Sequence, residues 1–211
     1  MLGHTFKGYA KEDPGAIQQK VTPIIVLLKL LDLAQTELAT AMSDLVCAAF
    51  FFAMRTFEYT KTSTTVETKR TNIITFRNIC FYRKNWILRH DQDIDNADWV
   101  NITFEYQKND EMNLSACTDQ ITSVSAQSYC GKKSMTRIRL YKGTDPHTKC
   151  QVNTFMYNKG KRSTITFAGI QTNLRSAVQI LGKLRLGFRP MEMGAHSICS
   201  GAAMAIYLTG V

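Results

Sequence analysis

The segment "MGAHSICSGAAMAIYLTGV", residues 193–211, carries the side chains of this sequence best suited to chemistry. His196 stands three residues ahead of Cys199, and a run of Gly and Ala follows. Imidazole and thiol groups ligate metals, and they also take part in proton transfer and nucleophilic attack. Three interpretations therefore fit the segment: a core helix, a metal site, or a catalytic helix.

Basic side chains are the second candidate feature, because the formal net charge of +9 is unevenly spread. Residues 121–190 hold thirteen Lys and Arg against one acid, whereas residues 91–120 hold one against eight. Such a surplus predicts a polyanion partner, nucleic acid first and an anionic membrane second. Predicted phosphate contacts are Lys159, Lys161 and Arg162 of the turn "NKGKRS", and Arg175. The alternative is a solvated basic face with no nucleic-acid role, which would give no steep salt dependence of binding.

The cysteines and histidines do not predict a metal centre, and no cofactor is expected. The six cysteines include no C-x-x-C pair, and the four histidines are scattered. The N-terminus lacks the apolar stretch of a secretory signal, which favours an intracellular protein with reduced thiols. Neither "IIVLLKLL" nor "LVCAAFFFAM" reaches the roughly 18 apolar residues of a membrane span, so no membrane partner is expected.

Several helices are predicted to position these side chains. Residues 1–20 are polar and aperiodic, which indicates a flexible lead-in. Thr22 and Pro23 are typical of an N-cap and a first helical residue, and apolar residues at three- and four-residue steps predict a second helix from about Glu37. The remaining predictions are a short helix around Cys130 to Tyr141, a helix capped by Thr166 that ends near Gly182 or Gly187, and a closing helix from Ala195 or His196.

Between these helices the composition changes to Thr, Ile, Val and aromatics, which favours strands. The segments "TNIITFRNICFY", "NWILRH" and "WVNITFEYQK" are predicted strands, with Asn85 near one turn and "DQDIDNAD" as an exposed loop. Residues 114–149 give the weakest signal and are predicted as loop apart from the short helix. The expected fold class is therefore α+β, mostly helical, with a small antiparallel β-sheet between helical segments.

Three segments in this order resemble a known family. "AMRTFEY", "ITFEYQKND" and "GAHSICSGAAMAIYL" are similar to the catalytic domain of tyrosine recombinases, or phage-type integrases, in particular the mobile-element variant. The family motifs are A-x-R-x-x-E, a lysine on a β-hairpin, and H-x-x-R. By this resemblance Arg55 and Glu58 match the first motif, Lys108 the second and His196 the third. Lys84 is a rival for the hairpin lysine.

The resemblance implies a metal-free DNA strand transfer, in which a tyrosine attacks the scissile phosphate and forms a phosphotyrosyl link. Arg55 would bind the phosphate through its planar, permanently charged fork. Lys108 would be the general acid for the leaving 5′-oxygen, and His196 would share its proton. Glu58 would support the structure. Double-stranded DNA is then the partner, the location is nuclear, and a homo-oligomer on DNA stays open.

The sequence departs from the family at two points. Cys199 stands where the second arginine belongs, and a thiol is a weak donor that cannot replace a guanidinium. The family's tyrosine nucleophile lies beyond the H-x-x-R helix, and Tyr207 stands only eleven residues after His196. We therefore expect residues 21–211 to be a recombinase-like catalytic domain that is incomplete at its C-terminus and impaired in DNA recombination and integration. The alternative is a noncatalytic DNA-binding module.

Overall fold

The computed structural model of the chain describes residues 19–60, 73–88, 91–104, 116–121, 131–140, 150–157 and 161–209. These residues form a mostly helical α+β structure with a small antiparallel sheet, which confirms the predicted fold class at that level. Of the lead-in, only residues 19 and 20 are described. None of the helices in the described residues is long and apolar enough to cross a membrane.

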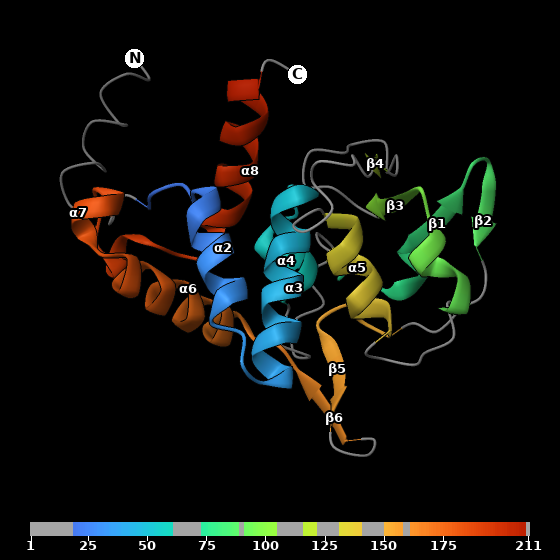
Figure 1. Ribbon diagram of the computed structural model, residues 1–211, viewed down its shortest axis with the longest axis horizontal. Helices are drawn as coiled ribbons and strands as arrows, with labels where there is room; N and C mark the ends of the chain where they lie inside the picture. The colour runs from blue at the N-terminus through green and yellow to red at the C-terminus, as the bar shows by residue number, and fades with distance from the viewer. Residues whose placement is uncertain are drawn as a thin grey trace, which may run out of the picture.

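The helices lie mainly at the two ends of the chain (Figure 1). The α-helices are α2 (Ile24–Asp32), α3 (Glu37–Phe51), α4 (Thr56–Tyr59), α5 (Gly131–Leu140), α6 (Phe167–Leu181), α7 (Lys183–Leu186) and α8 (His196–Thr209). The described residues also include 3₁₀ helices at Phe76–Asn78 (η1), Asp91–Asn96 (η2) and Pro190–Glu192 (η4).

The strands form a four-stranded sheet and a separate hairpin. The sheet contains β1 (Ile79–Arg83), β2 (Trp86–Leu88), β3 (Trp99–Phe104) and β4 (Ala116–Ile121) in the order β2-β1-β3-β4. All neighbours are antiparallel, and the register pairs Tyr82 with Trp99, whose rings stack 3.9 Å apart. β5 (Thr154–Tyr157) and β6 (Lys161–Thr164) form the hairpin.

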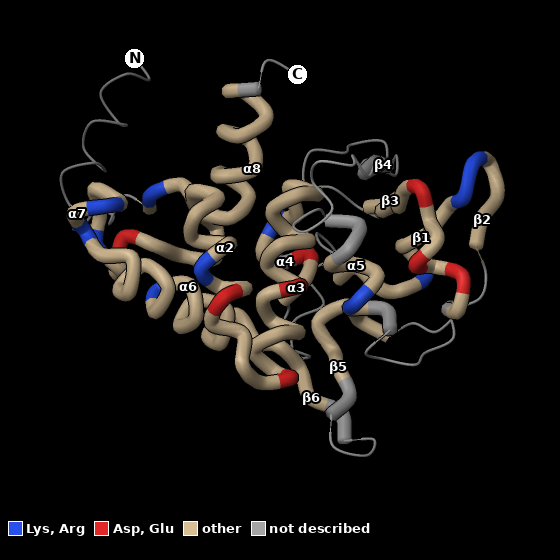
Figure 2. The backbone as a smooth tube through the Cα atoms, in the orientation of Figure 1, with Lys and Arg blue, Asp and Glu red and all other residues tan. Residues whose placement is uncertain are grey.

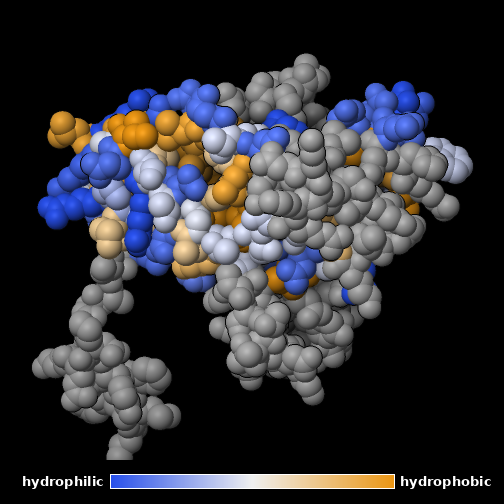
Figure 3. All heavy atoms as spheres, turned by 90° about the horizontal axis from the view of Figure 1, so that it is seen from below, coloured by the Kyte–Doolittle hydropathy of each residue, from blue (hydrophilic) through white to orange (hydrophobic). Residues whose placement is uncertain are grey.

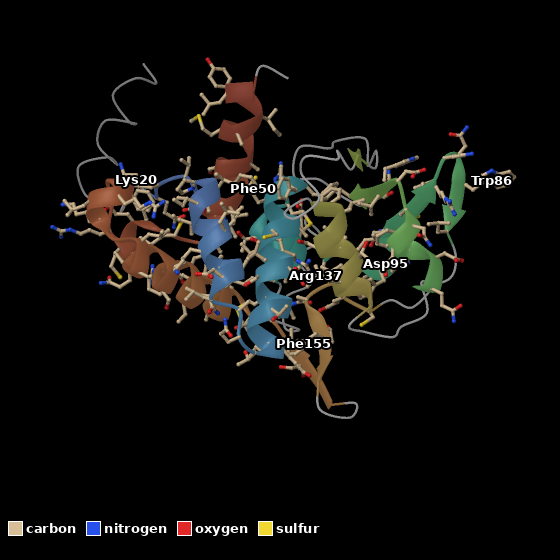
Figure 4. All side chains as sticks on the ribbon, viewed as in Figure 1. Lys20, Phe50, Trp86, Asp95, Arg137 and Phe155 are labelled. Carbon is tan, nitrogen blue, oxygen red and sulfur yellow. The ribbon has the colours of Figure 1, made fainter. Side chains whose placement is uncertain are left out.

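The sheet and the terminal helices share one hydrophobic core, with α5 between them (Figure 1). Buried apolar side chains run from Leu27 of α2 and Leu45 of α3 to Ile102 of β3. α5 is fastened to α3 by Arg137, whose Nε donates to the two carboxylate oxygens of Asp44 at 2.9 and 2.8 Å (Figure 4). Asp44 is fully buried, so this ion pair lies inside the fold.

Local sequence signals set two of the helix starts. The hydroxyl of Thr36 accepts a hydrogen bond from Ala39 N, and the hydroxyl of Thr166 accepts one from Gly169 N. Each caps N–H groups that have no partner inside the helix. At its other end, α6 stops at Gly182, which has a φ of 81°. Glycine adopts such a positive φ readily because it has no Cβ. The predicted starts at Glu37 and Thr166, and the end near Gly182, are therefore confirmed.

A tight turn at Ala53 separates α3 from α4. Ala53 N donates to Phe50 O at 3.1 Å, and Met54 N donates to Ala49 O at 2.8 Å. This is the Schellman pattern, in which a left-handed residue follows the C-cap. Ala53 occupies that position with a φ of 49°, although glycine is usual there. The turn redirects the chain so that Arg55 begins a new helix.

Several predicted elements differ from the observed ones. Pro23, not Thr22, occupies the N-cap of α2, because Thr22 is buried and its backbone N–H donates to Ser197 O of α8. The first strand begins at Ile79, because residues 76–78 form η1, whose Asn78 side chain accepts from Thr75 N. The acidic segment 91–98 contains the 3₁₀ helix η2.

Two further β elements lie where none was predicted. β4 falls inside residues 114–149, for which only a loop and a short helix were predicted, although the helix itself, α5, is confirmed. The sequence "ACTDQI" of β4 contains three polar residues and lacks the β-branched run that marks a strand. β4 forms a strand because its backbone pairs with β3, and its composition gives no sign of this pairing. Likewise "NKGKRS", predicted as a turn, contains the start of β6.

Candidate functional site

The first residues of α4 and α8 lie against each other, although they are about 140 positions apart in the sequence (Figure 1). Thr56 Oγ1 lies 3.4 Å from His196 Nδ1. One turn further along α8, the thiol of Cys199 donates to Ala53 O at 3.3 Å. We call Arg55, Thr56, Glu58, Tyr59, His196 and Cys199 the α4–α8 cluster.

Arg55 and Glu58 are held by the motif in which they occur. Arg55 N donates to Glu58 Oε2 at 2.6 Å, and Glu58 N donates to Arg55 O at 2.8 Å, so each residue fixes the other's backbone. Glu58 O in turn accepts from Ile74 N at 2.8 Å, which ties α4 to the segment that leads into the sheet. The spacing R-x-x-E therefore has a structural reason: Glu58 caps the helix that Arg55 opens.

The guanidinium of Arg55 has an unused donor. The residue is half-buried, and its Nη1 is buried without a hydrogen-bond partner among the described groups. Leaving a buried donor unpaired costs about 1–3 kcal/mol, and more for a charged group. An acceptor oxygen brought by a ligand would remove this cost, as expected of a site that an anion completes.

His196 stands at the solvent-exposed first position of α8. Its ring lies 6.4 Å from that of Phe167, and on its other side it meets Thr56. The start of a fourteen-residue helix carries a partial positive charge. Two N–H groups of this first turn are already used, because Ser197 N donates to Gly194 O at 3.0 Å and Ile198 N donates to Ala195 O at 3.3 Å. The imidazole of His196 therefore lies at the N-terminus of α8 and beside the start of α4, where Arg55 is located.

Burial governs the protonation of the α4–α8 cluster. Burial raises the pKa of Glu58, and the hydrogen bond and positive charge of Arg55 reduce that rise. Burial also raises the pKa of the Cys199 thiol, and the nearby charge of Glu58 raises it further, against the lowering effect of Arg55. The pKa of Tyr59 is raised by burial as well. Cys199 is therefore a neutral thiol at neutral pH, and it contributes no charge to a bound anion.

The raised pKa of Glu58 predicts a specific pH dependence of stability. The folded chain keeps this proton in a pH range where the unfolded chain, with an ordinary value of 4.5, has released it. The stabilisation is therefore complete below that value and is lost as pH rises through the folded pKa. We expect Glu58→Gln to remove this loss, measured by urea unfolding from pH 4 to 8.

Glu192→Gln is the matched control for this experiment. Glu192 accepts from Arg189 N at 2.7 Å in the same R-x-x-E arrangement, at the start of η4. Its substitution removes the ionisable group of an equivalent cap while keeping an acceptor oxygen, and the loss of stability with rising pH should persist. Equal pH profiles in wild type and Glu58→Gln would contradict the assignment.

Of the other sequence-predicted site residues, the structure places Arg175 and Lys84, and both lie outside the α4–α8 cluster. Lys108 and Lys159 fall outside the described residues, as do the side chains of Lys161 and Arg162, whose backbone belongs to β6. In Figure 1 this hairpin lies at the end of the molecule opposite the tip of α8. Arg175, on α6, donates from Nε to Met193 O at 3.2 Å, so its guanidinium holds the segment that leads to α8. Lys84, the rival lysine, is exposed in the β1–β2 turn.

Two members of the α4–α8 cluster, Thr56 and Tyr59, were not predicted from the sequence. Both lie within the motif segment "RTFEY", and their spacing from Arg55 is the signal that could have pointed to them.

Of the three interpretations of residues 193–211, a metal site finds no support, because the described residues hold no group of three His, Cys, Asp or Glu able to ligate a metal. Tyr207 lies far along α8 and is 80% exposed.

The chain was compared with protein-family models, with curated proteins and with solved structures, and none of them matches it.

Proposed function

We propose that this chain is a DNA-binding protein of the tyrosine recombinase type, with an integrase-like fold, and that its α4–α8 cluster binds one phosphodiester of double-stranded DNA. The observation that carries the proposal is the contact between the starts of α4 and α8, through Thr56 with His196 and Ala53 with Cys199. It brings the Arg55 segment next to the H-x-x-C segment. These are the two segments whose motifs resemble that family.

In this proposal each side chain of the cluster has a separate task. Arg55 donates to the nonbridging phosphate oxygens, using a guanidinium that never loses its charge. The exposed imidazole of His196 completes the phosphate contact from the α8 side, and the buried hydroxyl of Thr56 positions that imidazole. Lys108, in the connection between β3 and β4, would supply the proton to the leaving oxygen of a strand-transfer step.

Cys199 weakens the strand-transfer part of the proposal. A neutral thiol that donates to Ala53 O offers the phosphate neither charge nor a free donor. Removing one donor to a developing negative charge typically costs about 10²–10³ in rate. This favours, as a second candidate function, a noncatalytic DNA-binding module in which the cluster is a phosphate contact only.

Substitution of Arg55 tests the phosphate contact. We expect Arg55→Gln to weaken binding of a duplex. The negative slope of log K against log salt should become less steep by about 0.9, the value for one B-DNA phosphate contact. Fluorescence anisotropy from 50 to 300 mM NaCl measures both quantities. Arg83→Gln removes the same charge from an exposed position on β1 and should leave the slope unchanged. An Arg55→Gln slope equal to that of wild type would contradict the proposal.

Cys199→Arg separates the two candidate functions. With a tyrosine-bearing segment appended after Val211, this variant should form a covalent protein–DNA adduct on a nicked suicide substrate if the cluster is of the recombinase type. Duplex binding without an adduct supports the noncatalytic module instead. The same fusion with Cys199 retained is the control, because only the donor at position 199 then differs.

A further inference from the structure

A group of positive side chains lies at the corner where α6 turns into α7 and the chain continues to η4 (Figure 2). α6 ends at Gly182, and the four-residue helix α7 ends at Gly187 with a φ of 79°. These two turns make the chain reverse at the edge of the molecule. The group, which we call the α7 corner, consists of Lys20, Lys183, Arg185 and Arg189.

The charge of the α7 corner is not neutralised within the part of the chain that the structure describes. None of the four side chains forms an ion pair there, in contrast to Lys29, which contacts Asp32. The sole acid between residues 166 and 195 is Glu192, whose carboxylate accepts from Arg189 N. Lys183, Arg185 and Arg189 are exposed. The corner therefore presents uncompensated positive charge to solvent.

The β1–β2 turn is different, although it also exposes a lysine and an arginine. Lys84 N donates to Asp98 Oδ2 at 2.7 Å, and Asp93 and Asp95 of η2 lie in the segment that packs on β1 and β2. In Figure 2 the basic tip of this hairpin lies above acidic residues. Arg83 and Lys84 form no ion pair among the described residues either, but three acids, Asp93, Asp95 and Asp98, accompany these two positive charges, whereas Glu192 alone accompanies the four of the α7 corner. The turn is therefore a control for the α7 corner.

The α7 corner is joined directly to the α4–α8 cluster. Lys20 N donates to Glu192 O at 2.9 Å, and two residues later Thr22 N donates to Ser197 O at 3.0 Å. The segments 20–22 and 192–197 therefore run side by side from the corner to the start of α8, and Lys20 is seen near α7 in Figure 4. Arg175 holds the same stretch through Met193 O. These backbone contacts connect the corner to the start of α8, although residues 190–195 themselves carry no Lys or Arg and one acid, Glu192.

We propose that the α7 corner binds the backbone phosphates of double-stranded DNA beside the phosphodiester held by the α4–α8 cluster. This inference rests on the proposed function, which supplies the first phosphate contact. A linear polyanion fits because the paired segments 20–22 and 192–197 join the exposed positive charges of the corner to the α4–α8 cluster, and a duplex carries regularly spaced phosphates that can contact both.

Exposed apolar side chains at the same corner suggest the competing partner, an anionic membrane. Leu184 is fully exposed, Ile180 is 56% exposed and Met191 is 60% exposed. Figure 3 shows hydrophobic atoms among hydrophilic ones at this end of the molecule. Membrane insertion would use Leu184, whereas binding to backbone phosphates would not. We favour DNA because of the connection to His196, and Leu184 provides the means to distinguish the two.

The test compares two charge-matched double variants of the full chain. Lys183→Gln/Arg185→Gln removes one lysine and one arginine from the α7 corner, and Arg83→Gln/Lys84→Gln removes the same pair from the β1–β2 turn. All four side chains are exposed, so both variants should fold. Binding of a duplex of about 30 base pairs is measured by fluorescence anisotropy from 50 to 300 mM NaCl.

In the corner variant, which loses two phosphate contacts, the negative slope of log K against log salt should become less steep by about 1.8. This change amounts to about a thirtyfold loss of affinity at 0.15 M salt. The β1–β2 variant should bind like wild type, because in Figure 1 the β1–β2 hairpin lies on the other side of α3 and α5 from α8, so that Lys84 is no part of the α4–α8 cluster. Leu184→Asn should also bind like wild type. Equal slopes for the two double variants would overturn the inference. So would binding to phosphatidylserine vesicles that Leu184→Asn abolishes, with no duplex binding by wild type.

The failure of this inference can be told apart from that of the proposed function. If Arg55→Gln weakens duplex binding and the corner variant does not, the inference is wrong and the phosphate contact of the cluster stands. If the corner variant lowers the slope and Arg55→Gln has no effect, the corner binds DNA and the proposed role of the cluster is wrong.

Discussion

Replacing Arg137 by Met should lower the free energy of unfolding by about 3–5 kcal/mol, the cost of leaving a buried charge without its partner. Asp44 is fully buried on α3, whereas the Arg137 side chain is 30% exposed. Loss of the arginine therefore leaves a carboxylate that water cannot reach. Burial and the charge of Asp44 also raise the pKa of the neighbouring thiol of Cys47, to about 12. This agrees with a dry environment.

Urea unfolding checks the expected loss, with two controls. Lys29→Met breaks the surface pair of Lys29 with Asp32, whose side chain is 68% exposed, and should cost about 0–1 kcal/mol. Asp44→Leu combined with Arg137→Met removes both charges and should recover most of the stability, because an apolar pair replaces an ionic one. If the single Arg137→Met variant unfolds like Lys29→Met, the ion pair does not fasten α5 to α3.

Gly201→Ala should destabilise the protein by about 1–3 kcal/mol, although alanine is the better helix former. A Cβ at this position would overlap Thr22 O and would lie 3.1 Å from the ring of Phe50. The backbone oxygen cannot move aside without displacing the segment that leads into α2. The substitution therefore pushes α8 away from α2 and α3, and it should also disturb the contacts of His196.

Gly169→Ala is the matched control, since it makes the same change in another helix. A Cβ there would lie 3.4 Å from Thr166 Oγ1 and 3.5 Å from Met42 Cε, which is ordinary contact. This variant should be neutral, or stabilised by up to about 1 kcal/mol through helix propensity. Thermal unfolding of the two variants decides the matter, and an equal melting temperature for both would show that α8 has room at Gly201.

Features that depend on local sequence could be predicted, and features that depend on distant pairing could not. Thr36 and Thr166 cap their helices through residues three positions away, so their signals are contained in a few letters. β4 forms because β3 supplies its hydrogen bonds, and a weak local pattern gives no sign of that. Thr22 failed as a predicted cap because α8 engages its backbone from 175 positions further along the chain.

The same distinction applies to the candidate site. Arg55, Glu58, His196 and Cys199 were singled out by motif spacing, and the contact between the starts of α4 and α8 brings their segments together. That Cys199 donates to Ala53 O depends on the left-handed turn at Ala53, which the sequence does not announce because glycine is the usual residue there. The partnership of Asp44 with Arg137 spans 93 positions and follows no motif.

The stacked pair of Tyr82 and Trp99 gives the sheet its own optical reporter. The chain has two tryptophans, and the indole of Trp99 lies on Tyr82 and donates to Lys84 O, whereas Trp86 is 78% exposed and extends from β2 (Figure 4). Emission from one indole therefore follows the integrity of the β1–β3 ladder, and emission from the other follows the solvent. Fluorescence thus senses opening of the sheet separately from melting of the helices, which circular dichroism records.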